Sequence, residues 1–126
     1  MENANTITSF TKLVAWQESH ALVLFIYRAT KEFPKDELFG LVSQMRRAAV
    51  SITSNIAEGF SRTTYREKIQ FYTIALGSLT ELENQLLVAR DVGYLAIDVF
   101  QKGADQAVLA EKILKGLIRK SKTYVI

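Results

Sequence analysis

The sequence predicts an all-α protein that folds as an antiparallel, up-down-up-down four-helix bundle. Apolar residues recur every three or four positions along four long segments, which is the period of an amphipathic helix. No segment shows the sustained alternation of a β-strand, and the connections between the four segments are short. With 126 residues, of which 48% are hydrophobic, the chain is expected to form one domain over residues 1–126.

The first helix is predicted over residues 11–33. It should end at Phe33, because Pro34 disfavours the helical region for the residue before it. Residues 21–27 are apolar nearly all the way round the helix, which is more than one core-facing stripe requires. This excess predicts a second buried contact, such as another subunit.

The second helix is predicted over residues 36–58, with Gly59 as its C-terminal stop. Its core-facing side is expected to begin at Leu38 and to continue through Leu41 and Val42. Polar residues recur beside this apolar side at helical spacing, so they form a stripe. The stripe consists of Gln44, Arg47, Ser51, Asn55 and Glu58.

The third helix is predicted over residues 64–91. Thr64 and Glu67 have the spacing of a capping box, in which the threonine oxygen accepts from the backbone amide of the glutamate. Gly93 follows the helix and is placed to adopt the left-handed conformation that commonly ends one.

The fourth helix is predicted over residues 96–121. Its apolar stripe includes Ile97 and Val108. Gly103 and Gly116 should weaken this helix, each by up to about 1 kcal/mol relative to alanine.

Several classes of protein are disfavoured by what the sequence lacks. Cysteine is absent, which rules out disulfides and thiolate metal sites and suits a reducing cytoplasm, the compartment that we expect. The opening residues, MENANTITSF, have no basic stretch followed by an apolar core, so we expect no signal peptide. No apolar run approaches the roughly 20 residues that span a bilayer, so no membrane partner is expected.

No catalytic apparatus is expected either. His20 is the single histidine, and Gln17 stands where a di-metal site in a helical bundle would need a glutamate three residues before it. The glycines are isolated and form no phosphate-binding loop. We therefore predict no enzyme, no metal and no cofactor. An enzymatic site would have to be built from His20, Glu58 and Glu81.

Basic residues are concentrated in two places, although the net charge is only +3. From Glu111 to the C-terminus, Glu111 is the one acidic residue, and the basic residues are Lys112, Lys115, Arg119, Lys120 and Lys122. On the second helix and around the turn to the third, the basic residues are Arg46, Arg62, Arg66 and Lys68, with Tyr65 and Phe71 among them. Cations can contact phosphates and tyrosine can stack on a base, so these nine residues are the candidates for nucleic-acid binding. The alternative is a set of solvated helix faces, with cations near a helix C-terminus where they suit the dipole.

Three motifs in the middle of the chain, SQMRRAAVSI, SNIAEG and ALGSLTELE, carry a family resemblance. Together with the opening FTKLVAWQES, they resemble the four-helix bundle proteins associated with 23S ribosomal RNA intervening sequences, over residues 10–95. The resemblance implies a bundle that assembles as a ring-shaped homopentamer. A similar bundle, the accessory variability determinant of diversity-generating retroelements, partners a reverse transcriptase and binds nucleic acid through a basic surface.

The resemblance also marks five polar residues. Arg47, Asn55, Glu58, Glu81 and Glu83 look like the family's motif residues. Buried polar groups must be paired, so we expect them to form a structural network within or between subunits rather than a catalytic site.

Two departures qualify the resemblance. Thr53 stands where the family often has proline, so no proline kink is expected in the second helix. After Leu95 the match is one of helical pattern alone.

These observations favour a non-enzymatic, homo-oligomeric bundle that binds RNA, or a protein that handles nucleic acid, through basic surface residues. The alternative is a protein-interaction or scaffold module that makes no contact with nucleic acid. The resemblance does not decide between them, because proteins that share a fold need not share a function.

Overall fold

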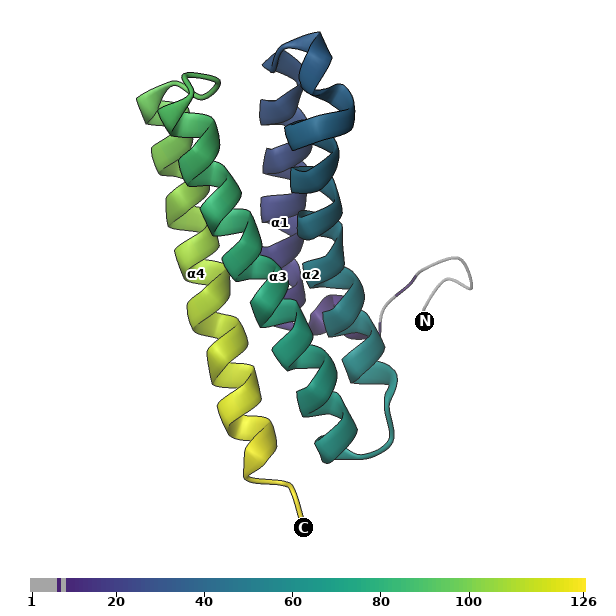
Figure 1. Ribbon diagram of the computed structural model, residues 1–126. Coiled ribbons are helices and arrows are strands. Elements are labelled where there is room, and N and C mark those ends of the chain that lie inside the picture. Colours follow the sequence, from purple (N-terminus) through teal and green to yellow (C-terminus); the bar gives the residue numbers. More distant parts are fainter. Residues whose placement is uncertain (1–6, 8) are drawn as a thin grey trace.

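The computed structural model describes residues 7 and 9–126 and shows a bundle of four long helices (Figure 1). They are α1 (Val14–Ala29), α2 (Ser43–Ser61), α3 (Tyr65–Asp91) and α4 (Ile97–Lys122). Contacts join α1 to α2, α2 to α3, α3 to α4, and α4 back to α1, so sequential helices are neighbours. The described residues contain no strand, and the predicted all-α four-helix bundle is confirmed.

The first helix is shorter than the predicted residues 11–33. A 3-10 turn, η1 (Phe10–Lys12), precedes α1 and is separated from it by Leu13, whose backbone is extended. A second 3-10 turn, η2 (Thr30–Glu32), follows α1. Phe33 is then extended with ψ of 154°, so the predicted break before Pro34 is confirmed.

The second helix does not begin as a regular α-helix at residue 36. A 3-10 turn, η3 (Lys35–Glu37), leads into a π-helical segment, η4 (Leu38–Val42), and α2 begins only at Ser43. Gly40 interrupts the segment with non-helical backbone angles. Because this segment changes the helical register, Leu38 is exposed, and its predicted place in the core is wrong.

The C-terminal end of α2 also differs from the prediction. The helix continues past Gly59 to Ser61, so Gly59 is not a stop. Gly59 is buried, and a Cβ atom at this position would lie 2.7 Å from Cε1 of Tyr72 on α3. The glycine therefore allows α2 and α3 to approach each other closely.

The boundaries of the last two helices agree closely with the predicted residues 64–91 and 96–121. Thr64 Oγ1 accepts from the backbone N–H of Glu67 at 3.2 Å, as the capping box predicts. Gly93 has φ of +86°, which confirms the predicted left-handed residue after α3. The α4 helix ends one residue later than expected, at Lys122.

The core is formed by aliphatic side chains from all four helices. Its fully buried members include Leu22, Ile26, Ile52, Ile56, Leu79, Leu82 and Leu114. On α4, Ile97 and Val108 were expected in the apolar stripe, but both are exposed. Gly103 is buried instead, and a Cβ atom there would lie 2.5 Å from Cε1 of Phe25 on α1.

None of the helices in the described part of the chain is both long enough and apolar enough to cross a membrane. The opening segment, for which we expect no signal peptide, lies largely outside the described residues.

Candidate nucleic-acid interface and polar contacts

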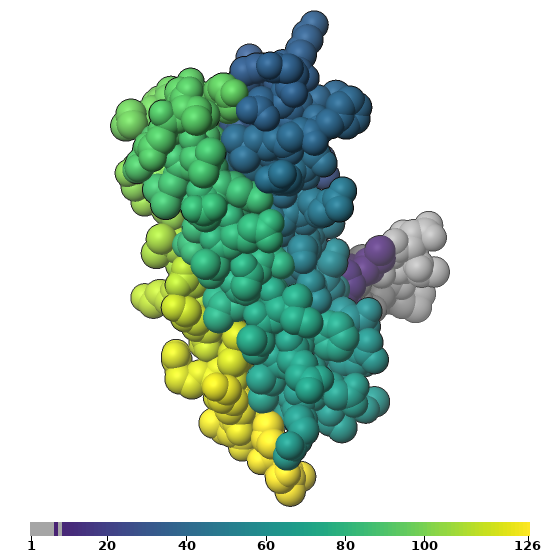
Figure 2. Space-filling view, viewed as in Figure 1, coloured from purple at the N-terminus to yellow at the C-terminus, as the bar shows by residue number. Residues whose placement is uncertain are grey.

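The fold brings residues from both predicted groups of basic residues to one end of the bundle. We call this the basic end, and it comprises residues 62–68 at the start of α3 and residues 119–126 at the end of α4 (Figure 1). Figure 2 shows the C-terminal residues lying against the start of α3. The rings of Tyr65 and Tyr124 are 4.9 Å apart between centroids. Residues 63–66 and 124–126 line a shallow concavity of about 370 Å³ beside these rings.

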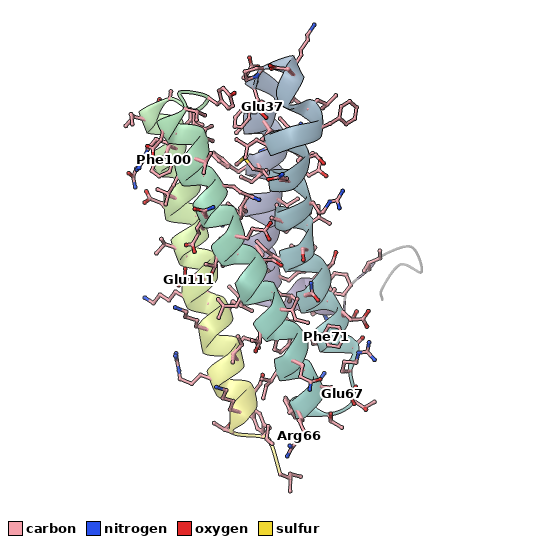
Figure 3. All side chains as sticks on the ribbon, in the orientation of Figure 1. Glu37, Arg66, Glu67, Phe71, Phe100 and Glu111 are labelled. Atoms are coloured by element: carbon pink, nitrogen blue, oxygen red, sulfur yellow. The ribbon has the colours of Figure 1, made fainter. Side chains whose placement is uncertain are left out.

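Some cations at or near the basic end are exposed and make no ion pair or hydrogen bond with the described residues. They are Arg66, Lys112, Arg119, Lys120 and Lys122. Figure 3 shows Arg66 at this end of the molecule, beside the last turn of α4. Because these side chains have no protein partner, their charge is available to an anion.

The other predicted basic residues near this end already have partners. The Arg62 guanidinium lies 3.3 Å from a Glu58 oxygen and 4.6 Å from the ring centre of Phe71. Lys68 Nζ donates to the backbone oxygen of Phe60 at 2.6 Å, near the C-terminal end of α2. Lys115 Nζ pairs with Glu111 at 2.7 Å.

Arg46 lies in the other half of the bundle and holds the end of α1. Its Nε donates to Thr30 Oγ1 at 3.0 Å, and its Nη2 donates to the backbone oxygen of Tyr27 at 3.3 Å. The guanidinium also lies 4.7 Å from the centre of the Tyr27 ring. The structure therefore separates Arg46 from the other candidate residues and gives it a structural role.

The five polar residues expected to form a network do not join into one within the described chain. Asn55 Nδ2 donates to the backbone oxygen of Ser51 at 2.8 Å, and Ser51 Oγ lies 2.8 Å from Ser78 Oγ on α3. This chain of contacts links α2 to α3. Glu58 belongs to a separate cluster, in which it accepts from Ser61 Oγ at 3.2 Å.

Glu81 is exposed and accepts from Nε2 of the buried Gln85 at 3.2 Å. The contact between Ser51 and Ser78 sets the register of α2 against α3. In this register Glu58 is level with residue 71 of α3, ten residues from Glu81. At 1.5 Å per residue, the two glutamates are about 15 Å apart along the bundle axis. The two carboxylates therefore do not meet, and a site built from both is not assembled.

Glu83 forms an acidic pair with Glu111 across α3 and α4. Burial, a hydrogen bond with Glu111 and its negative charge raise the pKa of Glu83 to about 7. The hydrogen bond with Lys115 lowers the pKa of Glu111, so the shared proton belongs to Glu83. Arg47 is exposed and has no partner among the described residues.

Among the described residues, the histidine and the acidic groups form no recognisable reactive centre. His20 stacks on Trp16, with ring centroids 4.5 Å apart and planes 11° from parallel. Over the described part of the chain, no group of three or more histidine, cysteine, aspartate or glutamate residues could hold a metal ion.

The half of the bundle opposite the basic end contains the end of α1, the start of α2 and the turn between α3 and α4, and we call it the upper half (Figure 1). Two of its features were not predicted from the sequence. Glu37 accepts from the Tyr94 hydroxyl at 2.9 Å and from the backbone N–H of Leu41 at 3.2 Å (Figure 3). It thereby joins η4 to the turn between α3 and α4. Phe39 is 92% exposed on the π-helical segment. Gly40 beside Phe39 was a signal for the second feature, because a glycine four residues after the expected start of the helix, residue 36, weakens the helix there.

The fold and its side chains define a small helical bundle protein with a basic end and exposed apolar grooves. The chain belongs to the 23S rRNA-intervening sequence protein family, whose model matches residues 11–116. The match extends into α4, beyond the limit near Leu95 that the sequence motifs gave.

A similar solved structure is a protein of unknown function from the S23 ribosomal protein family of Bacteroides thetaiotaomicron VPI-5482. The two chains share 21% sequence identity with a TM-score of 0.78, over 84% of this chain and 96% of that one. At this identity the likeness shows the fold alone. No curated protein matches the chain at a significant level.

Proposed function

We propose that this protein is a non-enzymatic, homo-oligomeric bundle of the cytoplasm that binds RNA through its basic end. The observation that carries the proposal is the gathering of unpaired cations there. Arg66 from α3 lies at the same end as Arg119, Lys120 and Lys122 from α4. Each cation that contacts a phosphate releases condensed counterions, which is the main source of non-specific affinity for nucleic acid.

The two tyrosines at the basic end suit a single-stranded or looped RNA better than a duplex. Tyr65 and Tyr124 are both exposed, and each ring can stack on an unpaired base. Their position beside Arg66 places aromatic and cationic groups within one concavity. The family description, which refers to an intervening sequence of 23S rRNA, is consistent with an RNA ligand.

Self-association would raise the affinity for RNA, because each subunit contributes one weak site. One basic end offers a few phosphate contacts, whereas several copies on one assembly bind the same RNA with a high effective concentration. The exposed apolar residues Leu24 and Tyr27 on α1 support an assembly, because the bundle itself does not bury them. The family resemblance makes five the expected number of subunits.

A salt titration tests the RNA-binding proposal. The wild-type protein should bind structured RNA in a filter assay with an affinity that falls steeply as salt rises. The triple variant Arg119→Gln, Lys120→Gln, Lys122→Gln should lower the slope of log K against log salt by about 2 to 3 and weaken binding at least tenfold.

The matched control is the double variant Lys31→Gln, Lys35→Gln, which removes exposed cations from the opposite end. It should leave the salt slope nearly unchanged. Absent binding, or a flat salt dependence, would reject the RNA proposal and favour the protein-interaction or scaffold alternative. Light scattering on the wild type tests self-association independently.

A finer proposal concerns the partner protein. We propose a role like that of the accessory variability determinant, in which the assembly presents nucleic acid to a reverse transcriptase. A gene for such an enzyme beside this one would support it. A position within a ribosomal RNA insert would instead favour a role tied to the intervening sequence.

A further inference from the structure

Two apolar grooves lie on opposite sides of the bundle. The helices contact one another in the cyclic order α1, α2, α3, α4, so the outer face between α1 and α2 is opposite that between α3 and α4. The α1/α2 groove has a volume of about 510 Å³. It is lined by Tyr27, Leu38, Phe39, Val42, Arg47 and Val50, among others.

Phe39 is the most exposed aromatic side chain that this groove presents. The π-helical segment turns it away from the core and leaves it 92% exposed. Tyr27 beside it is 40% exposed. An aromatic ring that stands this far out of the surface is suited to enter a pocket of a partner, and π-helical segments occur frequently at functional sites.

The α3/α4 groove is a smaller apolar hollow of about 190 Å³. Its walls are Leu86, Leu87, Phe100, Ala104 and Val108, and Glu83 stands at its edge. Val108 is 61% exposed and Leu87 is 42% exposed. A dry cavity of about 150 Å³ holds a benzene-sized ring, so this groove has room for one phenylalanine side chain.

The charged groups beside the two grooves are complementary. Arg47 at the α1/α2 groove has no partner in the described part of the chain. Glu83 and Glu111 at the α3/α4 groove share one hydrogen bond, and Lys115 is the cation that faces them. Lys115 pairs with Glu111, and no described cation forms a salt bridge with Glu83, so the ionised form of Glu83 leaves a place for a second cation.

The grooves also lie at the same height along the bundle. The contact between Ser51 and Ser78 sets the level of α2 against α3. The two helices are antiparallel, so the residue four positions before Ser51 is level with the residue four positions after Ser78. Arg47 is therefore level with Leu82, next to Glu83. Arg90 lies 4.8 Å from the ring centre of Phe100, which places Phe100 level with the upper turns of α3, near the height of η4.

We infer that the α1/α2 groove of one subunit docks on the α3/α4 groove of a second copy, with Phe39 entering beside Leu87 and Arg47 facing Glu83 and Glu111. This inference rests on the self-association in the proposed function and assigns its contact surfaces. The contact is heterologous, because each subunit uses two different surfaces. Since the grooves share one height, successive subunits gain no axial offset, which is one condition for a closed ring.

The experiment breaks each surface separately and then combines the broken proteins. Phe39→Asp disables the α1/α2 groove, and Leu87→Asp disables the α3/α4 groove. Light scattering and native mass spectrometry should show each variant alone near the mass of one chain, 14.2 kDa. An equal mixture should form a 1:1 heterodimer and nothing larger, because one native contact remains possible and both outer surfaces are blocked.

The control is Ile74→Asp, which places the same charge on an exposed residue of α3. Ile74 is nine residues from Glu83, or about half a turn away around the helix axis, so it lies outside the groove. This variant should keep the wild-type mass. All three positions are exposed, and circular dichroism with Phe39→Ser as a milder second variant checks that the subunits fold.

The outcomes separate this inference from the proposal on which it rests. A wild-type protein that is itself monomeric would overturn both. An assembled wild type with either single variant still at full mass would overturn the groove contact and leave self-association standing. Two monomeric variants whose mixture stays monomeric would also overturn it, because the grooves would then not meet each other.

Discussion

The upper half and the basic end of the bundle use the same residue types differently. Arg46 in the upper half is bound by Thr30, by the last turn of α1 and by an aromatic ring. Arg66 at the basic end has no protein partner. The sequence presents both as basic residues on helices. What separates them is the presence of a free carbonyl or an aromatic face within reach, which depends on how the helices pack.

The apolar surface differs between the two regions in the same way. The upper half carries the exposed Phe39 and the two grooves, whereas the basic end carries cations and two exposed tyrosines. Under the proposals above, the upper half joins subunits and the basic end meets RNA. The following predictions test that division, from the largest expected effect to the smallest.

The largest effect should come from the two glycines of α4. Gly103 in the upper half packs on Phe25, so Gly103→Ala should destabilise the fold by about 1 to 3 kcal/mol through overpacking. A Cβ atom at Gly116, nearer the basic end, would meet Arg119 Nη2 at 3.7 Å, an ordinary van der Waals contact, so Gly116→Ala should stabilise by up to about 1 kcal/mol. Urea unfolding of both variants measures the difference. Equal effects at the two positions would contradict the close contact between α1 and α4.

A smaller effect should distinguish the two arginines. Arg46→Ala removes hydrogen bonds from the end of α1 and should cost about 1 to 2 kcal/mol of stability, with RNA affinity unchanged. Arg66→Ala should change stability by no more than about 0.5 kcal/mol and should weaken RNA binding. Thermal melts and filter binding on the same two proteins supply both readouts. The division fails if Arg46→Ala lowers affinity while the fold stays intact.

The smallest effect concerns the pH dependence of the acidic pair. The pKa of Glu83 is raised to about 7 from an ordinary value of 4.5, so the folded state holds a proton that the unfolded state releases. The stability contributed by this carboxyl group is fully present below pH 4.5 and is lost as pH rises to about 7. Glu83→Gln should remove this loss, a gain of about 1 kcal/mol at pH 8, because solvent screens a partly exposed group.

The measurement is the free energy of unfolding from pH 4.5 to 8, with and without Glu83→Gln. Both proteins carry Phe39→Asp, so that no neighbouring subunit supplies Arg47. Glu111→Gln removes the other carboxylate of the pair. It should also flatten the pH dependence, because the negative neighbour that raises the pKa of Glu83 is then gone. Parallel curves for the parent protein and Glu83→Gln would contradict the shared proton.

Much of the fold followed from the sequence, because local rules fix helix period and helix ends. The capping box at Thr64, the left-handed Gly93 and the break before Pro34 each depend on a few neighbouring residues, and each prediction is confirmed. Leu38 and Gly59 were misjudged for different reasons, the first local and the second non-local. The π-helical segment turns Leu38 outward, and contact with Tyr72 rather than chain termination explains Gly59.

The sequence names candidate residues for the nucleic-acid interface, and the structure shows how those residues are arranged. The nine basic residues could be identified by charge, yet the sequence could not tell that Arg46 would lie apart from the others. Arg62 and Lys68 find partners at the turn between α2 and α3, where helix ends expose backbone carbonyls. The contact between Glu37 and Tyr94 joins residues 57 positions apart, and no local sequence pattern predicts it.

By itself the sequence determined the all-α class, the number and approximate span of the helices, and the total charge available to a ligand. These depend on periodicity and composition, which act along the chain. The tertiary structure alone decided which cations stay unpaired and where Phe39 points. It also decided that Gly103 allows α1 to pack closely on α4, in addition to weakening α4. The physical reason is that availability, burial and close approach are properties of surfaces from different helices, and they exist only once those helices have packed.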